Sequence, residues 1–224
     1  NLGATEINVV DVPAAVQSVV SVSNLNTLQM KDPQYFASML ANYILGGGAD
    51  SRLFMNLREK NGFTYGAYSG MSPSKYGSTF SANASVRNEV TDKAVKEFMS
   101  ELNAISTVTH QELANAKAKL KGDFIRSLER PETIARFAVN KKVNGLSDNF
   151  YTNYLKSIDA VTPEQVSAAV KANILSGQSR IFVAGKGEEI ADGLEKLGYP
   201  VKYYDRNANP VQRPSAQAVP ANVT

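Results

Sequence analysis

The sequence predicts an α+β fold in which helices pack on one face of an antiparallel sheet. Its 224 residues are 43% hydrophobic and 20% charged, the composition of a globular protein with a sizeable core. Segments with strand-like alternation come in neighbouring pairs, whereas helical periodicity dominates the stretch from Val90 to Ile174. Hairpin pairs followed by runs of helices are typical of α+β proteins.

The first elements are two predicted strands and a helix. The segments Glu6–Val12 and Val16–Asn24 are rich in Val and are separated by Pro13-Ala14-Ala15, which predicts a pair of strands. Asp32-Pro33 predicts a helix start, with Asp as N-cap and Pro at the first helical position. Three glycines, Gly46–Gly48, predict its end.

A short helix and a hairpin are predicted next. The helix runs from Ser51 to Lys60 and stops at Asn61-Gly62, because Gly tolerates the left-handed conformation common at helix ends. Phe63–Gly70 and Tyr76–Val86 then predict two strands joined by Ser72–Lys75. The alternation in the second strand predicts one buried and one wetter face.

The remaining elements are mostly helices. Thr109–Glu112 and Thr162–Gln165 are capping boxes, each of which predicts a helix start, and Pro131 predicts a break between two helices. The last predicted elements are a strand at Arg180–Ala184, a helix at Glu188–Leu197 and an edge strand at Val201–Tyr204.

We expect one domain, residues 1–206, followed by a linker or tail at residues 207–224. Pro210, Pro214 and Pro220 lie there among Ala, Gln, Asn and Ser without apolar periodicity. The chain begins at Asn1 with no leader sequence, so we expect it to be part of a longer polypeptide, and the tail suggests a further domain downstream.

Composition excludes several kinds of site. The chain has no cysteine, which excludes disulfides, thiolate catalysis and Cys-ligated zinc. Its single histidine, His110, cannot supply the paired histidines of a helical zinc motif and is expected to be a surface residue. A net charge of +3 without a basic cluster argues against nucleic-acid binding. No apolar run approaches the ~20 residues that span a bilayer.

The most informative stretch is Gly46–Gly70. A glycine turn leads into a short helix that carries Arg58, and a strand bearing Tyr65 follows, so both side chains are expected on the same side of the helix–strand corner. A guanidinium and a phenol there could donate hydrogen bonds to a peptide carbonyl or a developing oxyanion. The alternative is that Arg58 pairs with Glu59 and Tyr65 is a core aromatic.

This stretch resembles the second, non-zinc half of the pitrilysin/insulinase family of metallopeptidases. Members show a Gly-rich turn and then S-R-L-F-x-x-L-R-E-K-x-G-x-x-Y, which Ser51–Lys60, Gly62 and Tyr65 match. The resemblance spans most of residues 6–205. The family's zinc motif, H-x-x-E-H, is absent, and the loop Gly46–Gly48 is shorter than the one in the non-zinc subunit of the mitochondrial processing peptidase.

The resemblance implies a LuxS/processing-peptidase-like metallohydrolase fold whose two halves enclose a chamber for unfolded peptides. It implies that Arg58 and Tyr65 reach across to the other half's zinc site, and that Gly46, Gly47 and Gly48 contact substrate. This chain would hold no cofactor and be inactive alone. Zinc would belong to a partner domain, on the same polypeptide or in a heterodimer. We expect a bacterial envelope or periplasmic protein with no transmembrane segment.

Two alternatives remain open. The chain could be a structural relative, since core subunits of respiratory complexes share this fold without peptidase action. It could also be an independent, non-catalytic peptide-binding domain. A preceding domain that contains H-x-x-E-H would support the peptidase.

Overall fold

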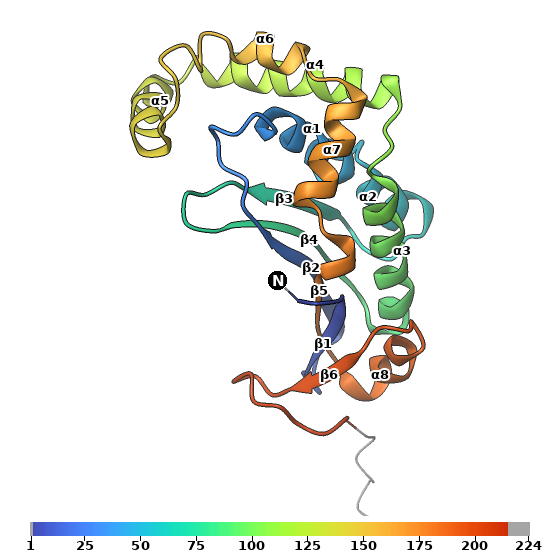
Figure 1. Cartoon of the computed structure of the whole chain (residues 1–224). Coiled ribbons are helices and arrows are strands. Elements are labelled where there is room, and N and C mark those ends of the chain that lie inside the picture. Colours follow the sequence, from blue (N-terminus) through green and yellow to red (C-terminus); the bar gives the residue numbers. More distant parts are fainter. Residues whose placement is uncertain (1, 215–224) are drawn as a thin grey trace, which may run out of the picture.

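The computed structural model describes residues 2–214 and contains one six-stranded sheet and eight α-helices within that range (Figure 1). The strands are β1 (Glu6–Asp11), β2 (Gln17–Asn26), β3 (Ala67–Ser72), β4 (Ser78–Arg87), β5 (Arg180–Gly185) and β6 (Val201–Tyr204). The helices are α1 (Tyr35–Gly46), α2 (Arg52–Phe54), α3 (Thr91–Ala104), α4 (His110–Ser127), α5 (Pro131–Asn144), α6 (Tyr154–Asp159), α7 (Pro163–Asn173) and α8 (Gly187–Glu195). A π-helical segment, Met55–Lys60, continues α2.

The sheet is mixed, with strand order β3-β4-β2-β5-β1-β6. β1 pairs in parallel with both β5 and β6, while β2, β3, β4 and β5 pair antiparallel. The α+β class is confirmed, but a purely antiparallel sheet is wrong. β5 inserts between β1 and β2, which the sequence treated as a pair. The first four residues of β1 are all buried. Ile7 and Val9 face the core, while Glu6 on the other face accepts hydrogen bonds from Asn8 and Lys202.

Helices cover one face of the sheet, as predicted. Helix α1 contacts β3, and α3 contacts β2 and β4. Helix α7 also contacts β2, and α8 contacts β1 (Figure 1). Along β2 and β4 every second residue is buried beneath them, and the core includes Leu40, Phe80, Phe98 and Ile181. We call the other side of the sheet the open face. Its side chains, by strand register, are Glu6, Asn8, Val10, Gln17, Val19, Ser21, Ser23, Leu25, Tyr68, Gly70, Ser72, Thr79, Ser81, Asn83, Ser85, Arg87, Arg180, Phe182, Ala184, Lys202 and Tyr204.

Two predicted boundaries are wrong. α1 begins at Tyr35 rather than at Pro33, because Asp32 closes a preceding turn: its Oδ2 accepts a hydrogen bond from the backbone N–H of Gln29 at 2.7 Å. β3 begins at Ala67 rather than at Phe63, so Tyr65 lies in a loop and not on a strand.

The helical stretch contains both predicted capping boxes, at the starts of α4 and α7. Pro131 opens α5, which ends at Gly145 in the left-handed conformation (φ 61°). Stacked rings join these helices: Phe137 lies 3.7 Å from Tyr151 and 5.7 Å from Phe124, measured between ring centroids. Aromatic stacking therefore holds α5 in place at the far end of the molecule from β6 (Figure 1).

The first residues of the expected tail fold back on the body. Pro210 forms a bridge with Tyr204, and the N–H of Val211 donates to the carbonyl of Tyr203 at 3.0 Å. The Arg213 guanidinium pairs with Glu195 on α8 at 2.9 Å. The rest of the expected tail, residues 215–224, lies outside the described residues. Over residues 2–214, no helix is long and apolar enough to cross a membrane.

Candidate functional site

Arg58 lies in the π-helical segment, with its side chain 46% exposed. Its Nε is 3.6 Å from Oε1 of Glu59, and its guanidinium carbon lies 4.9 Å from the centroid of the Phe54 ring. The alternative pairing with Glu59 therefore exists, but an exposed pair at this distance contributes little stability. The cation–π contact is what orients the guanidinium.

Tyr65 is 88% exposed, so its interpretation as a core aromatic is wrong. Its backbone is held by a local turn, in which Thr64 Oγ1 donates to the Gly66 carbonyl (2.9 Å) and the Gly66 N–H donates back to Thr64 Oγ1 (3.2 Å). Among residues 2–214, the Tyr65 hydroxyl has no hydrogen-bond partner. An ordered loop thus holds a phenol in solvent with its donor free.

Arg58 and the turn that carries Tyr65 are linked through two aromatic rings. The Phe54 ring beneath Arg58 contacts the Tyr68 ring, with 5.7 Å between centroids. Tyr68 in turn lies against Gly66, where an added Cβ would be 2.7 Å from Tyr68 Cε2. Tyr65 lines a groove of about 310 Å³ together with Gln17, Thr64, Gly66, Tyr68 and Ser85. The Arg58 side chain and the turn that carries Tyr65 therefore belong to one packed unit at the edge of the open face.

The glycine turn has a packing explanation. Gly46 is the buried last residue of α1, and an added Cβ would lie 2.3 Å from the backbone nitrogen of Ser69 on β3. A Cβ on Gly47 would lie 2.6 Å from the Cα of Tyr43. Gly46 therefore allows α1 to approach β3, whereas a side chain on Gly47 would clash with Tyr43 of α1 itself. Gly48 is half-buried next to Asp50, and substrate contact by these three glycines stays a prediction.

Arg52 is a residue of this region to which sequence reasoning gave no role. Its Nε and one terminal nitrogen pair with the two carboxylate oxygens of Glu112 at 2.7 and 2.9 Å, and it also donates to the carbonyls of Ala104 and Thr107. The hydrogen bond from Arg52 lowers the pKa of Glu112 to about 2. Arg52 therefore fastens the site helix to the start of α4, and the only sequence signal was its place in the S-R-L-F motif.

Metal ligands do not gather in this part of the chain. His110 is exposed at the first position of α4. Over residues 2–214, no three or more His, Cys, Asp or Glu side chains are grouped closely enough to hold a metal ion.

Comparisons with known proteins agree on one family. Residues 5–120 match the family model described as the peptidase M16 inactive domain. An uncharacterized zinc protease of Streptomyces coelicolor is 27% identical over 160 residues, which are 70% of this chain and 35% of that protein. The chain thus spans about a third of the length of the curated relatives it matches.

Solved structures share the fold. A peptidase M16 inactive domain from Pseudomonas fluorescens is similar with a TM-score of 0.75 and 29% identity, covering 81% of this chain and 43% of that one. A chain of complex III2 from Candida albicans has a TM-score of 0.68 at 16% identity, covering 88% and 49%. At that identity the likeness concerns the fold alone.

Proposed function

This chain belongs to the peptidase M16 inactive domain family, and from that premise we propose that it is the partner half of a zinc metallopeptidase. The predicted resemblance to the non-zinc half of these peptidases is confirmed. In the proposal, the chain forms part of a chamber wall around an unfolded peptide. A zinc-bearing domain of the same family, on the same polypeptide or on a second subunit, completes the site.

The observation that carries the proposal is the state of Tyr65. Exposing 88% of a large aromatic side chain gives up the hydrophobic stabilisation of burial, on the order of 2 kcal/mol. Here the surrounding turn is nevertheless ordered by Thr64 and Gly66. A free donor on a fixed backbone is the arrangement that hydrogen bonding to a substrate requires.

Arg58 adds a positive charge to the same unit. Guanidinium and phenol groups donate hydrogen bonds. When the protein already holds these donors in position, they stabilise the negative charge that a peptide carbonyl oxygen gains without having to move first. Both would hold that oxygen more strongly in the transition state than in the ground state, which raises the turnover number. Zinc in the partner domain would supply Lewis acidity and an activated water. This chain's own contribution is to bind and orient the carbonyl.

One observation favours an assembly role as the second candidate. Two apolar side chains one turn apart on α5, those of Val139 and Val143, are each more than half exposed. Exposed apolar side chains grouped on one helix suit a protein–protein contact. Such a role requires neither Arg58 nor Tyr65, so turnover measurements separate the two candidates.

The test is Tyr65→Phe in the chain joined to its zinc-bearing partner. The change deletes one hydroxyl, and we expect kcat to fall by on the order of 100-fold, the effect of removing one oxyanion donor elsewhere. Because Tyr65 is exposed, the melting temperature should not change. The matched control is Tyr76→Phe, since Tyr76 is 92% exposed on the β3–β4 connection and should leave kcat unchanged.

Arg58→Lys accompanies this test because it keeps the charge and the aliphatic stem while losing the planar fork. We expect a loss of kcat there too, with assembly intact by size-exclusion chromatography. Wild-type kcat in Tyr65→Phe would remove the donor role and leave the assembly role.

A further inference from the structure

The open face of the sheet is mostly hydroxyl- and amide-lined, with few charges. By strand register its only carboxylate is that of Glu6, and its cations are Arg87, Arg180 and Lys202. Arg87 is paired with Glu89 at 2.9 Å, just beyond the end of β4. The face therefore carries more cationic than anionic side chains. Which cation stays without a carboxylate partner depends on which one Glu6 pairs with.

Glu6 is already occupied by other groups. Its Oε2 accepts a hydrogen bond from Lys202 Nζ at 2.6 Å, and its Oε1 accepts one from Asn8 Nδ2 at 3.0 Å. Arg180 is next to Glu6 in register on the neighbouring strand, and its charge adds to the hydrogen bonds from Lys202 and Asn8 that lower the pKa of Glu6. Its guanidinium nevertheless forms no direct ion pair with a carboxylate among residues 2–214. Arg180 is therefore the unpaired cation of the open face in the described part of the chain.

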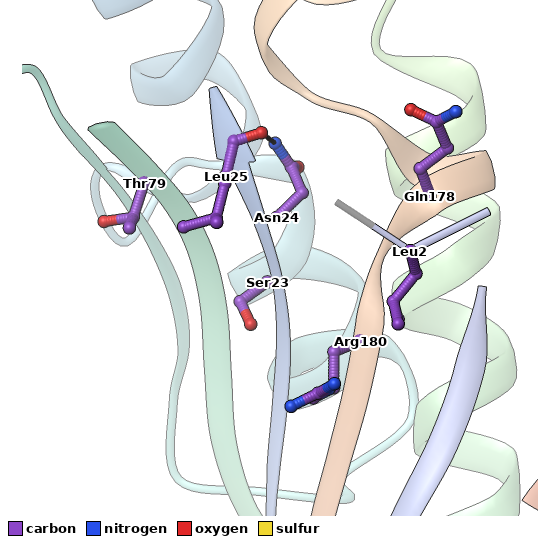
Figure 2. Close-up of a pocket in the computed structure, with 7 residues that line it drawn as sticks. All are labelled: Leu2, Ser23, Asn24, Leu25, Thr79, Gln178 and Arg180. Atoms are coloured by element: carbon purple, nitrogen blue, oxygen red, sulfur yellow. Dashed lines mark hydrogen bonds between the residues drawn. The ribbon is translucent and has the colours of Figure 1, made fainter. Parts of the chain in front are cut away.

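Arg180 lines the wall of a groove of about 450 Å³ over the C-terminal part of β2 and the start of β5 (Figure 2). The groove is lined by Leu2, Ser23, Asn24, Leu25, Thr79, Gln178 and Arg180. Ser23 is opposite Arg180 in register, which places the hydroxyl and the guanidinium on neighbouring strands ~5 Å apart.

The groove also has an apolar end. Leu25 is 56% exposed and lies two residues beyond Ser23 on β2, a step of ~7 Å along the strand. Figure 2 shows the Leu25 side chain directed toward Thr79, away from Arg180. A spacing of ~7 Å is also the repeat between side chains on one face of an extended peptide.

We propose that this groove binds an extended peptide through a carboxylate held by Arg180, with an apolar side chain two positions away resting on Leu25. A guanidinium binds a carboxylate through two parallel hydrogen bonds, and the Ser23 hydroxyl adds a third donor. The proposal deepens the proposed function, on which it rests for the idea that the ligand is a peptide. The preferred substrates are peptides with an Asp or Glu near an apolar residue, or peptides whose C-terminal carboxylate binds Arg180 instead.

The probes are three unstructured dodecapeptides of otherwise identical sequence. The first carries Asp-Gly-Leu and an amidated C-terminus, the second carries Asn-Gly-Leu with the same amide, and the third ends in Leu-Gly-Asn with a free C-terminal carboxylate. Binding to the isolated chain is measured by chemical-shift titration, which needs neither zinc nor turnover. We expect the Asp peptide to bind about five- to tenfold more tightly than the amidated Asn peptide, with a preference that declines as salt is raised.

Variants assign the preference to the guanidinium. Arg180→Gln should remove the preference for the Asp peptide, and Arg180→Lys should keep part of it because the charge remains. Arg87→Gln is the matched control on the same face and should bind like wild type. Melting temperatures verify that each variant is folded.

Equal binding of the Asp and amidated Asn peptides to the wild type would overturn the proposal, as would an undiminished preference in Arg180→Gln. If the free-acid Asn peptide binds as tightly as the Asp peptide, the groove accepts a terminal carboxylate as well. Because these measurements use the isolated chain, their failure is distinguishable from failure of the proposed function, which is measured as kcat with the partner domain.

Discussion

Replacing Glu112 by Gln removes the negative charge that holds Arg52 and should lower stability in a pH-dependent way. Glu112 is the third residue of α4 and takes part in the capping box with Thr109. Gln at this position supports the same box, so the change isolates the ion pair. The Arg52 and Glu112 side chains are only 19% and 30% exposed, which makes this the least exposed of the arginine–carboxylate pairs in the described residues.

The magnitude follows from the pKa of Glu112, which folding lowers from 4.5 to about 2, chiefly through the hydrogen bond from Arg52. A pKa change of that size corresponds to on the order of 3 kcal/mol at neutral pH. Solvent screening at the partly exposed pair reduces this to roughly 1–2 kcal/mol. In a domain of this length the melting temperature should fall by roughly 2–8 °C.

The pH dependence has a definite sign. Because the folded-state pKa is the lower one, the stabilisation is fully present above about pH 4.5 and is lost as the pH falls through about 2. Urea unfolding at several pH values between 2.5 and 7 should therefore show the wild type and Glu112→Gln converging at the acid end. The control is Glu89→Gln, since Glu89 belongs to the exposed pair with Arg87. A difference between wild type and Glu112→Gln that is absent at pH 7, or that does not shrink in acid, would refute the reasoning.

Two further changes test the packing around the site and the helical region. Gly46→Ala should destabilise the domain by about 1–3 kcal/mol, because the new methyl group meets the backbone of Ser69. Gly70→Ala is the control in the same thermal melts, since its Cβ would meet nothing within 4 Å. Equal melting temperatures for the two variants would contradict the packing explanation. Thr162→Ala should lower the free energy of unfolding by about 1 kcal/mol, because it removes the acceptor for the Gln165 N–H at the start of α7. Thr162→Ser should retain most of the stability. If chemical denaturation gives the same stability for the Ala and Ser variants, the cap contributes nothing.

The sequence alone determined the local elements and the family. Both capping boxes, the β3–β4 hairpin and the edge strand Val201–Tyr204 are present as predicted. Each depends on residues close together in the chain, where side-chain hydrogen bonds, turn residues and alternation act directly on the backbone. The motif around Arg58 and Tyr65 identified the family in the same way, because its residues are contiguous.

Tertiary structure decided what depends on partners far away in the sequence. The insertion of β5 beside β1 pairs two strands more than 160 positions apart, with Glu6 opposite Arg180 in register, and the Arg52–Glu112 ion pair spans 60 positions. Nothing local specifies such pairings, since they form where burial and charge neutralisation are most favourable over the whole chain. Tyr65 shows that exposure, like long-range pairing, depends on the tertiary structure. Its aromatic ring suits a strand or a core, but in the assembled sheet β3 begins at Ala67, so Tyr65 lies in the preceding loop and is exposed to solvent.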